Sequence, residues 1–312
     1  MMKSRRFLLL IVLVMCCFVS TANAVEIGLV WAGKSGMATR VVAGFEAGMN
    51  TLAPQVRVEY RKALSSIDAL AQVVKEWEGQ KSGIVVLRSN GAKWLAGNPL
   101  AVPTFIGGCN NPKQLGVVQN LESPEKNITG VTYFLPVETQ FDIFQSMLPD
   151  MTSVLLLLGS GNPSAEVDRE GTKTVCRNLA LSYREVECLG VNDALKAVRA
   201  VDSNQTTVVI GNQSLLFDRA DEIVAAAGNI PVVSYSDRAV KLGALGGFVA
   251  DDNKLGHMLA ESVVDVLVNG KSIRGTPIKF DQDPRFFVNL KTAEKLGIDL
   301  PYSVLSAATI IE

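Results

Sequence analysis

Short apolar runs alternate with longer segments of helical period along most of this chain, and this alternation constrains the fold more than any other feature. The runs are rich in Val, Ile and Leu, as buried parallel strands are, and the segments between them have the apolar spacing of amphipathic helices. The first unit contains expected strands at 25–31, 56–61 and 83–87 and expected helices at 35–52 and 66–78. This βαβαβ order predicts a parallel sheet covered by helices.

The alternation continues through a helix near 91–96 and a strand at 102–106, breaks across the polar residues 107–132, and then starts again. In the second series we expect strands at 153–158, 184–189, 207–210, 231–234 and 244–249, and helices at 137–147, 164–181, 192–201, 214–227 and 254–269. The tail adds an expected strand at 286–290 and a short helix at 292–296. This repeat predicts a second doubly wound lobe.

We therefore predict an α/β fold in which two doubly wound parallel-sheet lobes are joined by a multi-strand hinge. The N-terminal lobe is expected to comprise 25–132, with a return of about 278–312, and the C-terminal lobe is expected to comprise 133–277. In open α/β sheets, ligands bind beyond the carboxyl ends of the strands. The cleft between the lobes is therefore the expected binding site, and a hinge of several strands suits closure around a ligand.

The first 24 residues have the pattern of a secretory signal. Three basic residues precede an apolar run at 7–19, and Ala22-Asn23-Ala24 is a small-x-small cleavage site. The apolar run is shorter than the about 20 residues that a membrane-spanning helix needs. We expect a signal peptide at 1–24 and a mature protein in the periplasm.

The cysteines allow two further interpretations. A lipoprotein anchored at Cys16 is less favoured than a cleaved secretory protein, because Met15 is not the small residue that normally precedes a lipidated cysteine. The mature chain keeps Cys109, Cys176 and Cys188, and the last two lie at the end of an expected helix and in the next expected strand. Their spacing leaves one disulfide open as a possibility. The cysteine and histidine spacing does not match a zinc site, and we predict no metal.

Charge and motifs argue against nucleic-acid binding and catalysis. The formal net charge is −1, and it becomes more negative once the basic leader is removed, so neither nucleic acid nor an anionic membrane surface is an expected partner. His257 is the one histidine, and the sequence has no GxSxG elbow for a nucleophile. The stretch Gly28 to Ser35 formally fits a P-loop, but its apolar interior continues the first strand. We predict neither enzyme activity nor a cofactor.

Polar residues at the ends of the expected strands are the candidates for ligand binding. Asp237 and Asp251 would accept hydrogen bonds from a ligand cation or from hydroxyls, Trp31 would stack on the ligand, and Ser35 with the neighbouring helix-start amides would hold an anionic group. The full set of candidate ligand-binding residues is Trp31, Ser35, Ser89, Asn90, Cys109, Asn110, Asn162, Asn212, Gln213, Asp237 and Asp251.

Three stretches together resemble a known family. They are Asn127–Val131 followed by Pro136–Gln140, the Leu255-Gly256 pair, and the long stretch Phe287–Pro301. They are similar to the ABC-transporter substrate-binding proteins whose best-known members are the TrpX-like tryptophan-binding proteins, within the type I periplasmic binding protein fold. The resemblance covers essentially the whole mature chain, and it implies a two-lobed Venus-flytrap receptor that delivers a solute to a membrane permease.

The pocket positions differ from those of the family. Family members commonly have a glutamine where this chain has Trp31, and a Thr-Asp-Pro turn where it has Asn110-Asn111-Pro112. They often have Gly-Tyr-Asp-Tyr-Tyr where this chain has Val249–Asn253, so only Asp251 matches the family there. An amino acid or another small polar solute is therefore expected as the ligand. The alternative is a sensory subunit of the same shape that signals to a sensor kinase or another receptor. A monomer is expected in either case.

Overall fold

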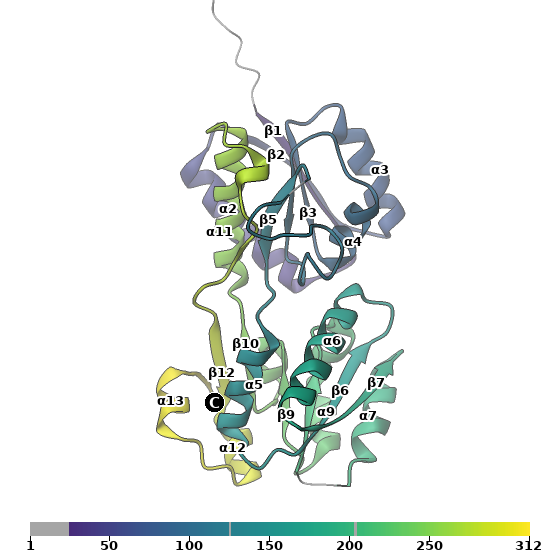
Figure 1. Cartoon of the computed structure of the whole chain (residues 1–312), viewed down its shortest axis with the longest axis vertical. Coiled ribbons are helices and arrows are strands. Elements are labelled where there is room, and N and C mark those ends of the chain that lie inside the picture. The colour runs from purple at the N-terminus through teal and green to yellow at the C-terminus, as the bar shows by residue number, and fades with distance from the viewer. Residues whose placement is uncertain (1–24, 125, 203–204) are drawn as a thin grey trace, which may run out of the picture.

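The computed structural model describes residues 25–124, 126–202 and 205–312, which form two α/β lobes stacked end to end (Figure 1). The predicted signal peptide at 1–24 lies outside these residues. Within the described ranges, none of the helices combines the length and the apolar character that crossing a membrane requires. The predicted fold class, two lobes each built on a doubly wound sheet, is confirmed.

The N-terminal lobe is built on a parallel sheet of six strands in the order β2-β1-β3-β4-β5-β11. The strands are β1 (Glu26–Ala32), β2 (Arg57–Leu64), β3 (Gly83–Leu87), β4 (Thr104–Gly107), β5 (Ile128–Thr132) and β11 (Lys279–Phe280). Its helices are α2 (Gly36–Leu52), α3 (Ile67–Glu78), α4 (Ser89–Gly97) and α11 (Asp252–Leu267), with a 3-10 turn at Ile273–Gly275. The side chains of β1 alternate between an apolar cluster shared with α2 and α11 and one shared with α3 and α4.

The C-terminal lobe contains seven strands in the order β7-β6-β8-β9-β10-β12-β13, and β12 runs antiparallel to β10. The strands are β6 (Ser153–Gly159), β7 (Ser182–Cys188), β8 (Thr206–Ile210), β9 (Val232–Ser234), β10 (Gly246–Val249), β12 (Arg285–Asn289) and β13 (Thr309–Ile311). The helices are α5 (Val137–Met147), α6 (Pro163–Asn178), α7 (Val191–Arg199), α8 (Ser214–Phe217), α9 (Ala220–Ala227), α10 (Asp237–Lys241), α12 (Leu290–Leu296) and α13 (Tyr302–Ala307). The first five strands repeat the order of the N-terminal lobe.

Strand β6 shows why an uninterrupted apolar run forms a central strand. Leu156 and Leu158 are buried in the cluster that contains α5 and α6, whereas Leu155 and Leu157 are buried in the cluster that contains α7 and α9. Both faces of the sheet are therefore covered by helices, as they are in parallel sheets.

The disulfide that the cysteine spacing left open is absent: within the described residues, Cys176 and Cys188 are free thiols. Both are fully buried, but Cys176 belongs to the apolar cluster on one side of the second sheet and Cys188 belongs to the cluster on the other side. The sheet between them prevents the sulfur atoms from meeting.

The chain crosses between the lobes three times, between β5 and α5, between β10 and α11, and between β11 and β12. Figure 1 shows α11 beside α2 in the N-terminal lobe and the yellow C-terminal elements in the other lobe. This path differs from the predicted boundaries, because about 252–280 belongs to the N-terminal lobe and 285–312 belongs to the C-terminal lobe.

A close contact between two helices fixes α11 in the N-terminal lobe. A Cβ atom at Gly44 would lie 2.0 Å from the carbonyl oxygen of Asn253, and one at Gly256 would lie 2.1 Å from that of Val41. The backbones of α2 and α11 touch at these glycines because they lack a side chain. Leu255 and Leu259 on α11 are fully buried in the same apolar cluster.

Most of the predicted elements agree with the structure within a few residues, and the exceptions are short. Strand β5 lies at the end of the stretch that was interpreted as a break, and the predicted helix at 214–227 divides into α8 and α9. Helices α10 and α13 and strands β11 and β13 were not predicted. These elements span two to six residues, so their periodicity is too brief to be recognised.

Candidate functional site

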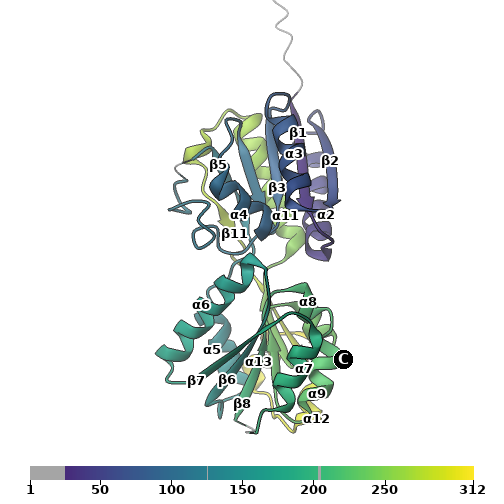
Figure 2. The same cartoon turned by 90° about the vertical axis from the view of Figure 1, so that its right-hand side faces the viewer.

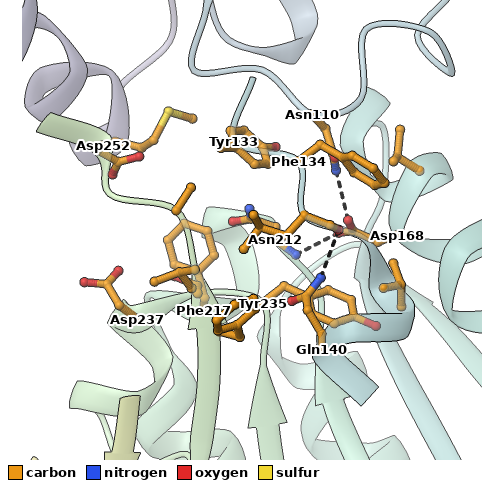
Figure 3. A pocket seen from close by; sticks show the side chains of 18 of the residues that line it. Asn110, Tyr133, Phe134, Gln140, Asp168, Asn212, Phe217, Tyr235, Asp237 and Asp252 are labelled. Atoms are coloured by element: carbon orange, nitrogen blue, oxygen red, sulfur yellow. Dashed lines mark hydrogen bonds between the residues drawn. The ribbon is translucent and has the colours of Figure 1, made fainter. Parts of the chain in front are cut away.

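Two adjoining cavities lie between the lobes. The inner pocket has a volume of about 70 Å³, and Figure 3 shows its lining. The outer chamber has a volume of about 730 Å³ and is lined by residues of both lobes, mostly at helix starts. The residues common to both cavities are Met37, Arg40, Tyr133, Asn212 and Phe217. The cavities therefore form one continuous cleft between residues of the two lobes, which Figure 2 shows one above the other.

Asp168 on α6 is the buried carboxylate of the inner pocket. Its Oδ2 accepts hydrogen bonds from the backbone N–H of Asn212 at 2.8 Å and from Gln213 Nε2 at 2.6 Å. Its Oδ1 accepts one from Asn110 Nδ2 at 3.0 Å (Figure 3). Burial raises the pKa of Asp168 to about 6, although all three donors lower it. Because Asn110 follows β4, the Asn110–Asp168 bond joins the two lobes.

Two other carboxylates approach the pocket from opposite lobes. Asp252 begins α11 of the N-terminal lobe, and Asp237 begins α10 of the C-terminal lobe. They lie on the same side of the pocket (Figure 3). Arg40 contacts Asp252 through Nε at 2.9 Å and Nη2 at 2.8 Å, and Lys241 Nζ lies 2.6 Å from Asp237 Oδ2.

The pKa of Asp252 is raised to about 6, mainly by burial. Arg40 opposes the rise, and the negative charges of Asp237 and Asp251 add to it. A cation placed between Asp252 and Asp237 would remove the repulsion and would link the lobes.

Aromatic rings form the apolar part of the inner pocket. Tyr133, Phe134, Phe217, Tyr235 and Phe248 all line it. The hydroxyl groups of Tyr235 and Thr172 share a hydrogen bond of 2.7 Å. Burial raises the pKa of Tyr133 and of Tyr235. These rings offer apolar faces to a ligand, whereas the carboxylates provide acceptors for a cation.

Seven of the eleven predicted residues line the cleft. Asn110 and Asp237 line the inner pocket, Asn212 lines both cavities, and the outer chamber is lined by Ser35, Ser89, Asn90 and Asn162. Several of these side chains also accept hydrogen bonds from backbone N–H groups of the protein.

Three serine and asparagine side chains of the cleft hold its backbone in place. Ser35 Oγ caps α2 by accepting from the N–H of Ala38, and Asn162 Oδ1 caps α6 by accepting from that of Ser164. Ser89 Oγ accepts from the N–H of Asn110 at 3.0 Å. Such caps fix the geometry of the loops at the cleft.

Trp31 does not line either cavity. Its side chain is buried in the apolar cluster of β1, α2 and α11, and it cannot stack on a ligand. The indole Nε1 is, among the described residues, the one buried side-chain nitrogen or oxygen without a hydrogen-bond partner. The period-two alternation of β1 places Trp31 on the same face as Ile27 and Leu29, which explains its position.

Cys109 and Gln213 also lie behind the cleft wall. Cys109 is fully buried, its Sγ lies 3.8 Å from the carbonyl oxygen of Val131, and burial raises the pKa of its thiol to about 12. Gln213 supports Asp168 and accepts a hydrogen bond from the N–H of Gly159 at 3.1 Å.

Asp251 belongs to the hinge rather than to the pocket. Its Oδ1 caps α11 by accepting from the N–H groups of Asn253 and Lys254, and its Oδ2 pairs with Arg285. Its backbone N–H donates to Asp281, whose buried carboxylate also lies 2.5 Å from Lys254 Nζ. The crossing segments at β10–α11 and β11–β12 are therefore tied together.

The eleven predicted residues do not include Asp168, Asp252, Arg40, Arg88 or the aromatic rings of the pocket. Asp252 follows the predicted Asp251 directly, so that prediction was one position away from the pocket. Asp168 lies within an amphipathic helix, where a single acidic residue carries no distinguishing signal. In the described part of the chain, His, Cys, Asp and Glu side chains form no group that could hold a metal ion.

This fold and cleft define a class: two-lobed proteins that enclose a small molecule between doubly wound sheets. The chain belongs to the ABC transporter substrate binding protein family, because the model of that family matches residues 38–311. Members of this family act outside the cytoplasm as solute-binding proteins of ABC systems, and they are not enzymes.

Individual relatives are distant. A tyrosine-binding protein from Clostridioides difficile is 18% identical over 266 residues, which cover 82% of this chain and 73% of that protein. A Streptococcus pneumoniae ABC domain, solved in complex with L-Trp, has a TM-score of 0.81 and 19% identity, with 93% of this chain and 100% of that one covered. A conserved domain protein from Vibrio cholerae has a TM-score of 0.80 and 20% identity, with the same coverage.

Proposed function

We propose that this protein captures an amino acid in the interlobe cleft and presents it to the permease of an ABC transporter on the outer side of the cytoplasmic membrane. The position of Asp237 and Asp252, which line one pocket from opposite lobes, is the observation that carries this proposal. The ammonium group of the ligand lies between the two carboxylates, and its apolar part contacts the aromatic rings of the inner pocket. The expected signal peptide supports a location in the periplasm.

The same arrangement couples binding to closure. Asp252 moves with the N-terminal lobe and Asp237 with the C-terminal lobe, so a cation that contacts both is bound fully only when the lobes are close. A ligand shifts such an equilibrium by its difference in affinity for the two states. The closed form is then the shape that the permease recognises. The relatives that bind tyrosine and tryptophan support an amino acid as the ligand.

A thermal-shift screen of residues 25–312 tests this proposal. The panel contains the L-amino acids, sugars, nucleosides and dicarboxylic acids, and a ligand at 100 times its Kd adds about 2.7 kcal/mol to the free energy of unfolding. We expect amino acids to raise the Tm and the other classes to leave it unchanged. Asp252→Asn should abolish the shift, whereas Asp142→Asn, at an exposed position of α5, should retain it. A shift with sugars alone would refute the proposal.

A further inference from the structure

Arg88 occupies an unusual position in the wall of the outer chamber. It precedes α4 with a φ of 74°, a backbone conformation that residues other than glycine rarely adopt. Its Nη1 donates to the carbonyl oxygen of Ala32, and a Cβ atom at Gly33 would lie 2.6 Å from this nitrogen. Strained backbone of this kind persists where the surrounding structure requires it.

The guanidinium of Arg88 has no anionic partner in the described part of the chain. Its side chain is half-buried, and burial lowers its pKa. Among the other cations of the outer chamber, Arg40 pairs with Asp252 and Arg238 lies 3.6 Å from Asp218.

Lys34 makes no ion pair within the described residues either, and Asp218 is the one acidic side chain in the lining of the outer chamber. The chamber therefore has an excess of positive charge around Arg88 and Lys34. A partly buried cation without a partner is costly unless an anion reaches it.

The size of the two cavities indicates how a ligand would reach Arg88. The inner pocket, at about 70 Å³, is about a tenth of the volume of the outer chamber. A solute whose ammonium group lies between Asp237 and Asp252 must therefore extend most of its length outwards. Met37, Tyr133 and Phe217 line both cavities and provide the apolar surface between the two ends.

We propose that the outer chamber binds a second, terminal oxyanion of the solute, with Arg88 as its main hydrogen-bond donor and Lys34 as a second cation. The ligand class is then an amino acid whose side chain ends in a carboxylate or another oxyanion. A guanidinium suits this role because its N–H groups match the geometry of an oxyanion. The assignment of the amino end rests on the proposed function, whereas the oxyanion site rests on the outer chamber itself.

A matched pair of probes tests this site. Isothermal titration calorimetry compares 4-carboxy-L-phenylalanine with its isosteric amide, 4-carbamoyl-L-phenylalanine, on the wild-type protein and on Arg88→Gln. We expect the acid to bind wild type about tenfold more tightly than the amide, as one charge-assisted hydrogen bond provides, and Arg88→Gln to lose this preference. Arg57→Gln, at an exposed site of β2, is the matched control and should retain it.

The other outcomes of this titration also decide for or against the oxyanion site. Equal binding of the two probes to wild type, or a preference that survives in Arg88→Gln, would overturn the oxyanion site and leave the proposed function intact. If Arg88→Gln does not fold, Lys34→Gln must reduce the preference. If neither probe binds, the amino-acid screen decides the proposed function separately, and inorganic sulfate decides the oxyanion site: it must raise the Tm of wild type more than that of the Arg88 or Lys34 variant.

Discussion

Asn110 and Asp168 join the two lobes through a hydrogen bond of 3.0 Å between Asn110 Nδ2 and Asp168 Oδ1. Asn110 is held by Ser89 in the N-terminal lobe, and Asp168 is held by Gln213 and the N–H of Asn212 in the C-terminal lobe. The side chains of Asn110, Ser89, Asp168 and Gln213 are all buried. The bond therefore links the two lobes at the inner pocket.

Substitution of Asn110 with Ala should favour the open arrangement of the lobes. Hydrogen bonds to charged groups contribute about 1.5–3 kcal/mol, so we expect an amino-acid ligand to bind about tenfold or more weakly. Small-angle X-ray scattering should show a larger radius of gyration for the ligand-free variant. Asn120→Ala, at an exposed position of the same loop, is the control. Unchanged affinity in Asn110→Ala would show that the bond does not contribute to closure.

The stability of the protein should depend on the titration of Asp168. Burial raises its pKa from the ordinary 3.8 to about 6, so the folded state binds more protons than the unfolded chain between these values. The free energy of unfolding therefore falls as pH rises through this window. Asp168→Asn cannot titrate, and urea denaturation at several pH values should show wild type losing stability relative to this variant as pH rises. A difference that is constant with pH would contradict the assignment.

Removal of the Asp281 carboxylate should weaken the hinge. The side chain is fully buried, accepts from the N–H groups of Asp251 and Asp283, and pairs with Lys254. Asp281→Ala leaves two N–H groups without an acceptor, and we expect it to lower the free energy of unfolding by about 2 kcal/mol. Asp299→Ala, at an exposed position near the C-terminus, should change it little. Equal effects of the two substitutions in urea denaturation would argue against a role for the hinge contacts.

Gly256→Ala should separate α11 from α2. The added Cβ would lie 2.1 Å from the carbonyl oxygen of Val41, so the helices must move apart. Overpacking of this kind costs about 1–3 kcal/mol, or more when backbone is in the way. Gly79→Ala provides a matched control because no atom lies within 4 Å of its Cβ. Chemical denaturation should show a clear loss for the first variant and almost none for the second.

The fold could be predicted from the sequence because its strands and helices are long enough for their periods to be distinct. Strand β6 has a continuous apolar run, and helix α5 buries Val137, Phe141, Phe144 and Met147 at helical spacing. The assignment of α11 to the correct lobe could not be predicted in this way. Periodicity shows that a helix has a buried face, and it does not show which sheet lies against that face.

The site was predicted less completely, for reasons that differ between residues. Residues at strand ends, such as Asn110 and Asp237, could be found because parallel sheets direct their carboxyl ends at the cleft. Trp31 lies on the core side of its strand, and the position of a helix start decides whether Asp251 or Asp252 faces the ligand. Asp168 acts through contacts with both lobes, which become apparent only when the lobes are assembled.

One calorimetric experiment tests the central claim that the ammonium group of an amino acid lies between Asp237 and Asp252. Residues 25–312 are titrated with L-tyrosine, L-tryptophan and 4-carboxy-L-phenylalanine, and each is paired with the analogue that lacks the amino group. We predict that at least one amino acid binds about tenfold or more tightly than its desamino analogue, and that Asp252→Asn removes the difference. Equal binding within every pair, or binding of none of the amino acids, would contradict this account.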